Sequence, residues 1–213
     1  MKYHKIQTIF KRDMSQPKRP LIYGDWTKPE FEYLANNDWL WTEKVDGTNI
    51  RIYWESGAVR IEGRNENSQI PSTLLNLINT QIAPAIICAD LPDGTVLYGE
   101  GCGQGIQKGK GFYTNDTGVN FILFDMASIH GTYYAWADVV GMAKTLNIRH
   151  APEVGMGSLF DSIELVRKGM KSELGNGASE GLVLRPLVEM YNRWGERVIC
   201  KIKTIDFANM VGG

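Results

Sequence analysis

Alternation of apolar and polar residues predicts a series of short β-strands. Asn49 to Trp54 alternates in this way, and Ser56-Gly57 separates it from a second run, Val59 to Glu62, which predicts an antiparallel hairpin. Trp39 to Val45 precedes the hairpin as another strand, and Asp46-Gly47 is a strong turn signal. Further strands are predicted at residues 95–99, 119–126, 180–186 and 198–203, and a strand or arm is expected within residues 1–20.

Helical spacing and helix start signals predict the remaining elements. Residues 71–83 place apolar side chains on one helix face, as expected for a helix packed on a sheet. Thr27-Lys28-Pro29-Glu30 combines a cap residue, an early proline and a glutamate at the capping-box offset, which predicts a helix from Pro29 to Ala35. Residues 136–147 and 158–170 are also predicted to be helical. The mixture of elements indicates an α+β fold.

Composition limits the classes of protein to which the chain can belong. Its 213 residues, 43% hydrophobic and 22% charged, are typical of a globular protein, and we expect one domain over residues 1–213. The formal net charge of -1 gives no attraction of the whole molecule to nucleic acid, so a surface that binds a polyanion would have to be a local basic patch. The basic first nineteen residues, and Lys108 with Lys110, are either such patches or ordinary solubilising charges.

Cysteine usage and hydropathy indicate the compartment. Cys88, Cys102 and Cys200 are widely spaced and odd in number, which fits neither a disulfide framework nor a zinc site and favours a reducing compartment. The N-terminus has no apolar core of signal-peptide length, and no apolar run approaches the roughly 18 residues that span a bilayer. We therefore expect a cytoplasmic protein with no membrane partner.

Lys44 is the strongest candidate for covalent chemistry, because it lies between apolar neighbours at a predicted strand end. A lysine amine attacks an electrophile only when unprotonated, and a pKa of about 10.4 leaves under about 0.1% neutral at pH 7. Burial or nearby cations can lower that pKa by about 3 units. Lys201 and Lys203 share one face of their predicted strand and could supply the cations. We predict that Lys44 is the nucleophile of a nucleotidyl transferase; the alternative is a set of solvated surface lysines.

Several separated motifs, taken in chain order, resemble the covalent nucleotidyl transferase superfamily of ATP-dependent ligases and capping enzymes. Lys44-Val45-Asp46-Gly47-Thr48-Asn49 looks like its nucleophile motif, and Glu180-Gly181-Leu182-Val183 and Lys201-Ile202-Lys203 look like its last two motifs. Arg64, Glu100 and Phe124-Asp125 look like the motifs between them. Asn49, together with Tyr98-Gly99-Glu100-Gly101 through Ile106-Gln107-Lys108-Gly109, points to the RNA ligase domain family common in phages.

The resemblance implies both a fold and a reaction. The fold would be an α+β nucleotidyltransferase domain, an ATP-grasp-like ligase adenylation domain with antiparallel sheets flanked by helices around a nucleotide cleft. The reaction would be that of an ATP-dependent RNA ligase: lysine adenylylation, transfer of AMP to a 5′-phosphate, and displacement of AMP by a 3′-hydroxyl. ATP, covalent AMP on Lys44 and Mg²⁺ or Mn²⁺ would be required. The partner would be nucleic acid with a 5′-phosphate and a 3′-hydroxyl end, expected to be RNA. The process would be RNA repair in the cytoplasm, or in the cytoplasm of the host cell if the protein is phage-encoded.

The resemblance also assigns roles to individual residues. Catalytic roles fall to Lys44, Lys201 and Lys203, the last two screening the α-phosphate and lowering the pKa of Lys44. Nucleotide contacts fall to Glu43 on adenine, Phe124 stacked on adenine, Glu100 on the ribose hydroxyls, Arg64, and Glu180, which would also hold a hydrated metal ion. Contacts with the substrate ends fall to Asn49, Arg64 and Asp125.

The sequence also departs from the family pattern. Family members usually continue into a helical or OB-like second domain, whereas only ten residues follow Lys203 and no such domain is recognised. The chain would be a minimal ligase gripping its substrate with the basic N-terminal arm and residues 105–111, or a catalytic domain that needs a partner or a longer chain. Cys102 stands where the family often has an aromatic residue. A DNA ligase or capping-enzyme core and an inactive module that binds nucleic-acid ends are the rival interpretations.

Overall fold

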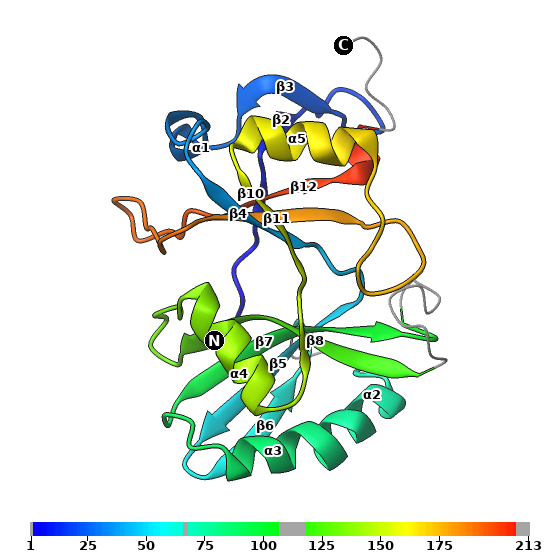
Figure 1. Ribbon diagram of the computed structural model, residues 1–213, viewed down its shortest axis with the longest axis vertical. Helices are drawn as coiled ribbons and strands as arrows, with labels where there is room; N and C mark the ends of the chain where they lie inside the picture. The colour runs from blue at the N-terminus through cyan, green and yellow to red at the C-terminus, as the bar shows by residue number, and fades with distance from the viewer. Residues whose placement is uncertain (1, 66–67, 107–117, 208–213) are drawn as a thin grey trace. The chain divides into compact units, whose positions relative to one another are not determined.

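The computed structural model describes residues 2–65, 68–106 and 118–207, which form two compact units (Figure 1). Unit 1 comprises Met1–His4, Val45–Ala151 and Leu174–Asn176, and unit 2 comprises Lys5–Lys44, Pro152–Glu173 and Gly177–Gly213. Each unit has a five-stranded sheet and a hydrophobic core of its own, so the predicted mixture of sheets and helices is confirmed. Whether the two units form a single domain depends on how they associate, so the single domain over residues 1–213 stays a prediction.

The sheet of unit 1 has the strand order β6-β5-β7-β8-β9. Its strands are β5 (Thr48–Glu55), β6 (Ala58–Glu62), β7 (Thr95–Gly103), β8 (Val119–Ser128) and β9 (Arg149–His150). The predicted hairpin is confirmed by the antiparallel pairing of β5 with β6. Its two turn residues both have positive φ, 52° at Ser56 and 76° at Gly57, as tight two-residue hairpins require.

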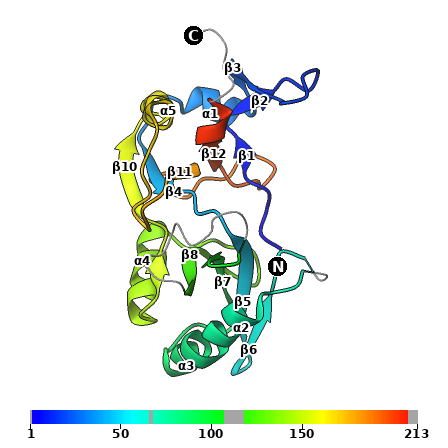
Figure 2. The same ribbon diagram turned by 90° about the vertical axis from the view of Figure 1, so that its right-hand side faces the viewer.

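One face of this sheet is covered by helices (Figure 2). They are α2 (Ser72–Leu77), a π-helical turn (Ile78–Ile82), α3 (Ala83–Cys88) and α4 (Trp136–Thr145). The helix predicted over residues 71–83 therefore continues to Cys88. Pro84 lies inside it, where a proline removes a hydrogen bond and clashes with the carbonyl four residues earlier. The wider π spacing, in which the Ala83 N–H bonds to the Ile78 carbonyl, accommodates the ring.

The sheet of unit 2 has the order β1-β12-β11-β4-β10, with β1 parallel to β12 and the other pairs antiparallel. Its strands are β1 (Gln7–Thr8), β4 (Trp39–Glu43), β10 (Glu153–Gly157), β11 (Gly181–Pro186) and β12 (Cys200–Lys203). Helix α5 (Leu159–Lys168) packs Leu159, Ile163 and Val166 against the core side chains of β11 and β12. Short helices are α1 (Pro29–Tyr33) and a 3-10 turn (Thr204–Asp206).

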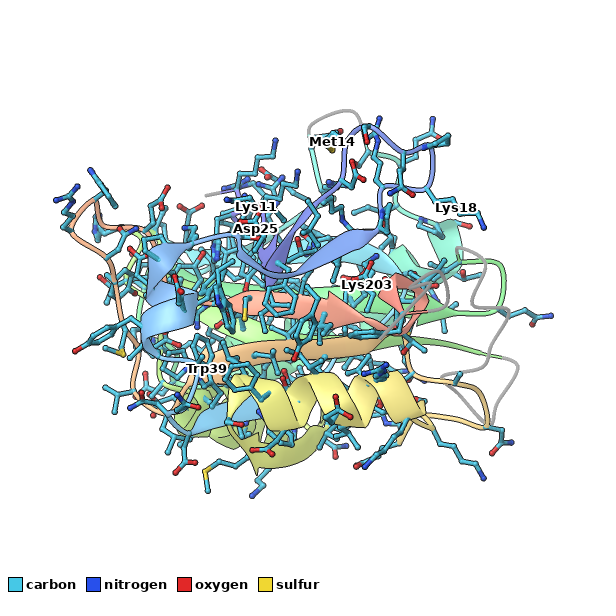
Figure 3. The ribbon with its side chains drawn as sticks, turned by 90° about the horizontal axis from the view of Figure 1, so that it is seen from above. Lys11, Met14, Lys18, Asp25, Trp39 and Lys203 are labelled. Carbon is cyan, nitrogen blue, oxygen red and sulfur yellow. The ribbon has the colours of Figure 1, made fainter. Side chains whose placement is uncertain are left out.

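Strands β2 (Phe10–Arg12) and β3 (Leu21–Trp26) form a separate antiparallel ribbon in unit 2. Figure 3 shows Lys11 and Asp25 beside each other on this ribbon, where the Lys11 Nζ and Asp25 Oδ1 atoms are 2.6 Å apart. The arm expected in residues 1–20 therefore contains β1 and β2. Among the described residues, no helix combines the length and the apolar character needed to cross a membrane.

Asp46-Gly47 does not form a hairpin turn, and its glycine is present for a different physical reason. Strands β4 and β5 on its two sides belong to different sheets. A Cβ atom at Gly47 would lie 2.2 Å from the Gly101 carbonyl oxygen, far inside van der Waals contact. Glycine is required here because the backbone of the loop lies directly on the backbone of β7.

Candidate active site

Lys44 follows β4 directly and is fixed to the beginning of β11. Its backbone N–H donates to the Gly181 carbonyl at 2.8 Å, which continues the pairing of the two strands. Its side chain is 22% exposed, and its ammonium group forms an ion pair with the Glu180 carboxylate. The lysine is therefore held at a strand end, as the sequence predicts, with a carboxylate as its partner.

Glu180 binds a second ammonium group as well. Lys203 Nζ lies 2.6 Å from Glu180 Oε1, so this carboxylate bridges lysines from the ends of β4 and β12. The next residue explains the close geometry: Gly181 has a φ of 144°, and a Cβ there would lie 2.1 Å from the Ile202 carbonyl oxygen. A glycine after Glu180 lets β11 approach β12 closely enough for this contact.

Lys201 completes the cluster from the same face of β12. Cys200 and Ile202 point into the core of unit 2, so Lys201 and Lys203, the latter labelled on β12 in Figure 3, lie on the opposite face. Burial lowers the pKa of Lys201 to about 8, helped by the positive charges of Lys44 and Lys203 and opposed by Glu180. The cluster has three cationic side chains around one carboxylate, which is a suitable environment for a phosphate group.

Glu43 lies beside this cluster in sequence, at the end of β4, but it is buried. Its carboxylate accepts a hydrogen bond from the Glu173 N–H at 2.9 Å. Burial raises the pKa of Glu43, while hydrogen bonds from Ser172 and Ser179 lower it. The side chain therefore already fixes the segment after α5, and its predicted contact with adenine stays a prediction.

The predicted site residues of unit 1 lie on its sheet. Asn49 on β5 and Glu100 on β7 are directly opposite each other in the antiparallel pairing, and both are half-buried. Phe124 on β8 is also half-buried, and it packs against Cys102 and Ile122 of a small apolar cluster. Cys102 therefore has a packing role, and burial raises the pKa of its thiol to about 12.

Asp125 is completely buried, next to the N-terminal segment. Its Oδ2 accepts a hydrogen bond from the Tyr3 hydroxyl at 2.7 Å, and its Oδ1 accepts one from the Met126 N–H at 3.1 Å. The Tyr3 ring also meets the Phe124 ring edge-on, with centroids 5.2 Å apart. The structure thus gives Asp125 structural partners, and its predicted contact with a substrate end stays a prediction.

Two residues that support these positions were not predicted. Arg51, 5% exposed, donates two hydrogen bonds to the Gly63 carbonyl, from Nε at 3.0 Å and Nη2 at 2.7 Å, and thereby holds the residue before the exposed Arg64. It lies two positions after Asn49 on β5, so strand alternation could have identified it. Tyr3 has no such signal, because it acts on a residue 122 positions away.

The site residues divide between the two units. Unit 2 brings together Lys44, Glu180, Lys201 and Lys203, and it also contains Glu43. Unit 1 contains Asn49, Arg64, Glu100, Phe124 and Asp125. Of the substrate grip predicted at residues 105–111, residues 107–111 lie outside the described part of the chain.

Glu180 also fits the binding mode expected for magnesium. The described residues contain no group of three or more His, Cys, Asp or Glu side chains that could hold a metal ion by themselves. Mg²⁺ usually keeps several water ligands and binds one or two carboxylates together with substrate phosphates. A single partly exposed carboxylate among three lysine side chains is suited to that mode.

This mixed α+β fold is that of solved RNA ligases. Naegleria gruberi RNA ligase with PPi superposes with a TM-score of 0.65 at 21% identity, covering 82% of this chain and 52% of that one. A variant of the same ligase with ATP and Mn gives a TM-score of 0.66 at 19% identity, covering 92% and 56%. The chain spans little more than half the length of these proteins.

The chain belongs to the RNA ligase family, whose model matches residues 37–203. That range includes every predicted site residue, from Glu43 to Lys203. Among the curated proteins, none matches the chain.

Proposed function

We propose that this protein is an ATP-dependent RNA ligase that joins a 5′-phosphate to a 3′-hydroxyl through a lysyl-AMP intermediate. The observation that carries the proposal is the cluster of Lys44, Lys201 and Lys203 around Glu180. Three separate segments of the family-matched region supply these side chains, so the proposed nucleophile and the two proposed phosphate-binding cations lie in one place. This is the arrangement that phosphoryl transfer requires.

In the first step, unprotonated Lys44 Nζ attacks the α-phosphorus of ATP. An N–P bond forms, the P–O bond to pyrophosphate breaks, the attacking nitrogen releases one proton to solvent, and negative charge increases on the phosphoryl oxygens during the attack. Lys201 and Lys203 stabilise that charge, because they lie beside Glu180, the ion-pair partner of Lys44. A hydrated Mg²⁺ or Mn²⁺ on Glu180 would supply further positive charge for the phosphates.

The residues of unit 1 would recognise the nucleoside and the RNA. Phe124 offers a half-buried ring for adenine, and Glu100 offers a carboxylate for the ribose hydroxyls. Exposed Arg64, fixed through Gly63 by Arg51, would bind phosphate or sugar, with Asn49 opposite Glu100. AMP would then pass to the 5′-phosphate of the RNA, and the 3′-hydroxyl would displace it. The Naegleria gruberi structures with ATP and Mn support the choice of nucleotide and metal.

The test is covalent labelling with ATP labelled at the α-phosphate, in the presence of Mg²⁺. We expect a denaturation-stable label on the unmodified protein and none on a Lys44→Ala variant. Lys168→Ala, which changes an exposed lysine at the end of α5, is the matched control and should label normally. Labelling with GTP in place of ATP would favour a capping enzyme, and equal labelling of the Lys44→Ala variant would contradict the proposal.

The substrate is tested separately with nicked RNA, nicked DNA and single-stranded RNA, each with a 5′-phosphate and a 3′-hydroxyl. Joining of RNA ends, lost in Lys44→Ala and retained in Lys168→Ala, is the expected result. Joining of nicked DNA alone would assign the chain to DNA ligation.

A further inference from the structure

The connection between β11 and β12 exposes an unusual amount of apolar surface. We call residues 187–197 the Trp194 hairpin; in Figure 1 it is the orange segment that extends beyond these two strands. Its exposed apolar side chains are Leu187, Val188, Met190, Tyr191 and Trp194, with Trp194 65% exposed. A soluble protein rarely gathers so many large apolar side chains on one short exposed segment without a ligand for them.

The hairpin is nevertheless rigidly built. The Asn192 side-chain oxygen accepts hydrogen bonds from the backbone N–H groups of Trp194 at 3.1 Å and Glu196 at 2.9 Å, which closes the turn. Tyr191 and Arg197 form an antiparallel bridge below the turn. The Arg197 side chain, 2% exposed, is paired with Glu189. The backbone that carries Trp194 is therefore ordered before any ligand arrives, which reduces the entropy lost on binding.

The charge on this hairpin favours an anionic ligand. Its two carboxylates are already neutralised, Glu189 by Arg197 and Glu196 by Lys28 at 2.7 Å. The guanidinium carbon of Arg193 lies 4.1 Å from the ring centroid of Trp194, and within the described part of the chain no carboxylate pairs with it. The tip thus presents an exposed aromatic ring with one positive charge, which no carboxylate of the described residues neutralises, held over that ring.

We propose that the Trp194 hairpin binds an unpaired stretch of the RNA substrate, with a base stacked on Trp194 and a neighbouring phosphate on Arg193. The assignment rests on the proposed function for the identity of the nucleic acid. Aromatic side chains beside cationic groups are the usual means of holding single strands, because every base has a flat face to stack. An apolar protein surface would leave Arg193 without a partner, so the polyanion is the better match.

The length of β11 sets a lower bound on the distance between this platform and the lysine cluster. Glu180 precedes β11 and the hairpin follows it, so six strand residues, about 20 Å at roughly 3.3 Å per residue, separate Glu180 from the base of the hairpin, and Trp194 at the tip lies farther away. At about 3.4 Å per stacked nucleotide, the base on Trp194 lies more than about six nucleotides from the reacting end. Strands much shorter than this should not use the hairpin.

Binding of fluorescently labelled RNA without ATP tests the proposal independently of any covalent chemistry. Trp194→Ala should weaken the affinity for a 20-nucleotide single strand about tenfold and leave that for a 4-nucleotide strand unchanged. Trp194→Phe should retain most of the affinity because it keeps a stacking face. Arg193→Gln should reduce the slope of log affinity against log salt concentration by about one, as expected for the loss of one phosphate contact. Tyr33→Ala, which removes an 86% exposed aromatic residue on α1, is the matched control.

Equal affinity of Trp194→Ala and the unmodified protein for the long strand would overturn the proposal. So would concentration-dependent self-association that Trp194→Ala abolishes with no change in RNA binding, because the hairpin would then be a contact between copies. ATP labelling of Lys44 should be unaffected by Trp194→Ala. If no variant labels with ATP but RNA affinity still depends on Trp194, the proposed ligase activity fails and the hairpin assignment stands.

Discussion

Lys201 is a cationic residue in surroundings that disfavour its charge. Its folded pKa of about 8 lies below the reference of 10.5, so between these values the unfolded chain holds a proton that the folded protein has released. Stability should therefore rise with pH through this window, and the full penalty of burying the charge is present below pH 8. In the proposed reaction a bound phosphate would relieve the same penalty by supplying the missing counter-charge.

Lys201→Met should consequently increase the free energy of unfolding at pH 7 by about 2 kcal/mol, a value reduced for the partial exposure of the side chain. The gain should shrink as the pH approaches 10, because the unmodified protein has then lost the charge as well. Urea denaturation at pH 7 and pH 10 measures both values. Lys168→Met should show no such pH dependence, and an equal gain for Lys201→Met at both pH values would contradict the argument.

At the scale of elements, two helices show how capping residues and glycine positions affect stability. Helix α5 begins where its sequence predicts, with Ser158 as cap: the Ser158 hydroxyl accepts from the Asp161 N–H at 3.1 Å, and the Asp161 carboxylate accepts from the Ser158 N–H at 3.1 Å. Helix α4 instead carries a glycine, Gly141, on its exposed side. Nothing lies within 4 Å of the position that a Cβ would occupy there.

Gly141→Ala should therefore raise the free energy of unfolding by about 0.5–1 kcal/mol, since it restricts the unfolded chain and improves helix propensity without a clash. Gly47→Ala is the matched contrast, because its Cβ would meet the backbone oxygen of Gly101 at 2.2 Å, and it should destabilise the protein. Thermal denaturation of the two variants measures both effects. A loss of stability in Gly141→Ala would show that α4 needs this glycine for another reason.

At the scale of the whole molecule, the N-terminal segment contributes to both units. Tyr3 belongs to the aromatic cluster of unit 1, with its ring 4.8 Å from that of Tyr98 and its hydroxyl on Asp125. A few residues later, β1 pairs with β12 and extends the sheet of unit 2. Residues 3–8 therefore contribute to the packing of two separate units.

Deletion of residues 1–8 should reduce hydrogen-exchange protection in both β8 and β12. Tyr3→Phe should cost about 1 kcal/mol through the lost hydrogen bond to Asp125 and should leave the protection of β12 unchanged. Tyr33→Phe, at an 86% exposed position, should change neither strand. Unchanged protection of β12 after the deletion would show that β1 does not contribute to the stability of unit 2.

Local signals account for much of the fold and for part of the site. The β5–β6 hairpin and α5 were predictable because turn residues and caps lie next to the elements they define. Strand β10 was not, because Gly155 and Gly157 interrupt its alternation to make room for the Trp41 ring. That Lys203 lies near Lys44 was expected from strand alternation and from the resemblance of the motifs to the family, whereas the ion pairs of both lysines with Glu180 were not predicted. The contact of Tyr3 with Asp125 depends on packing that no local pattern records.

The double pairing of Glu180 has a thermodynamic consequence. It serves as internal counter-ion to Lys44 and Lys203 at once, so a divalent ion that occupies this carboxylate leaves both ammonium groups to be neutralised from outside. In the proposed reaction the triphosphate of ATP would do so. Because linkage is reciprocal, each of the two ligands would then strengthen the affinity for the other, and metal and nucleotide would be taken up synergistically.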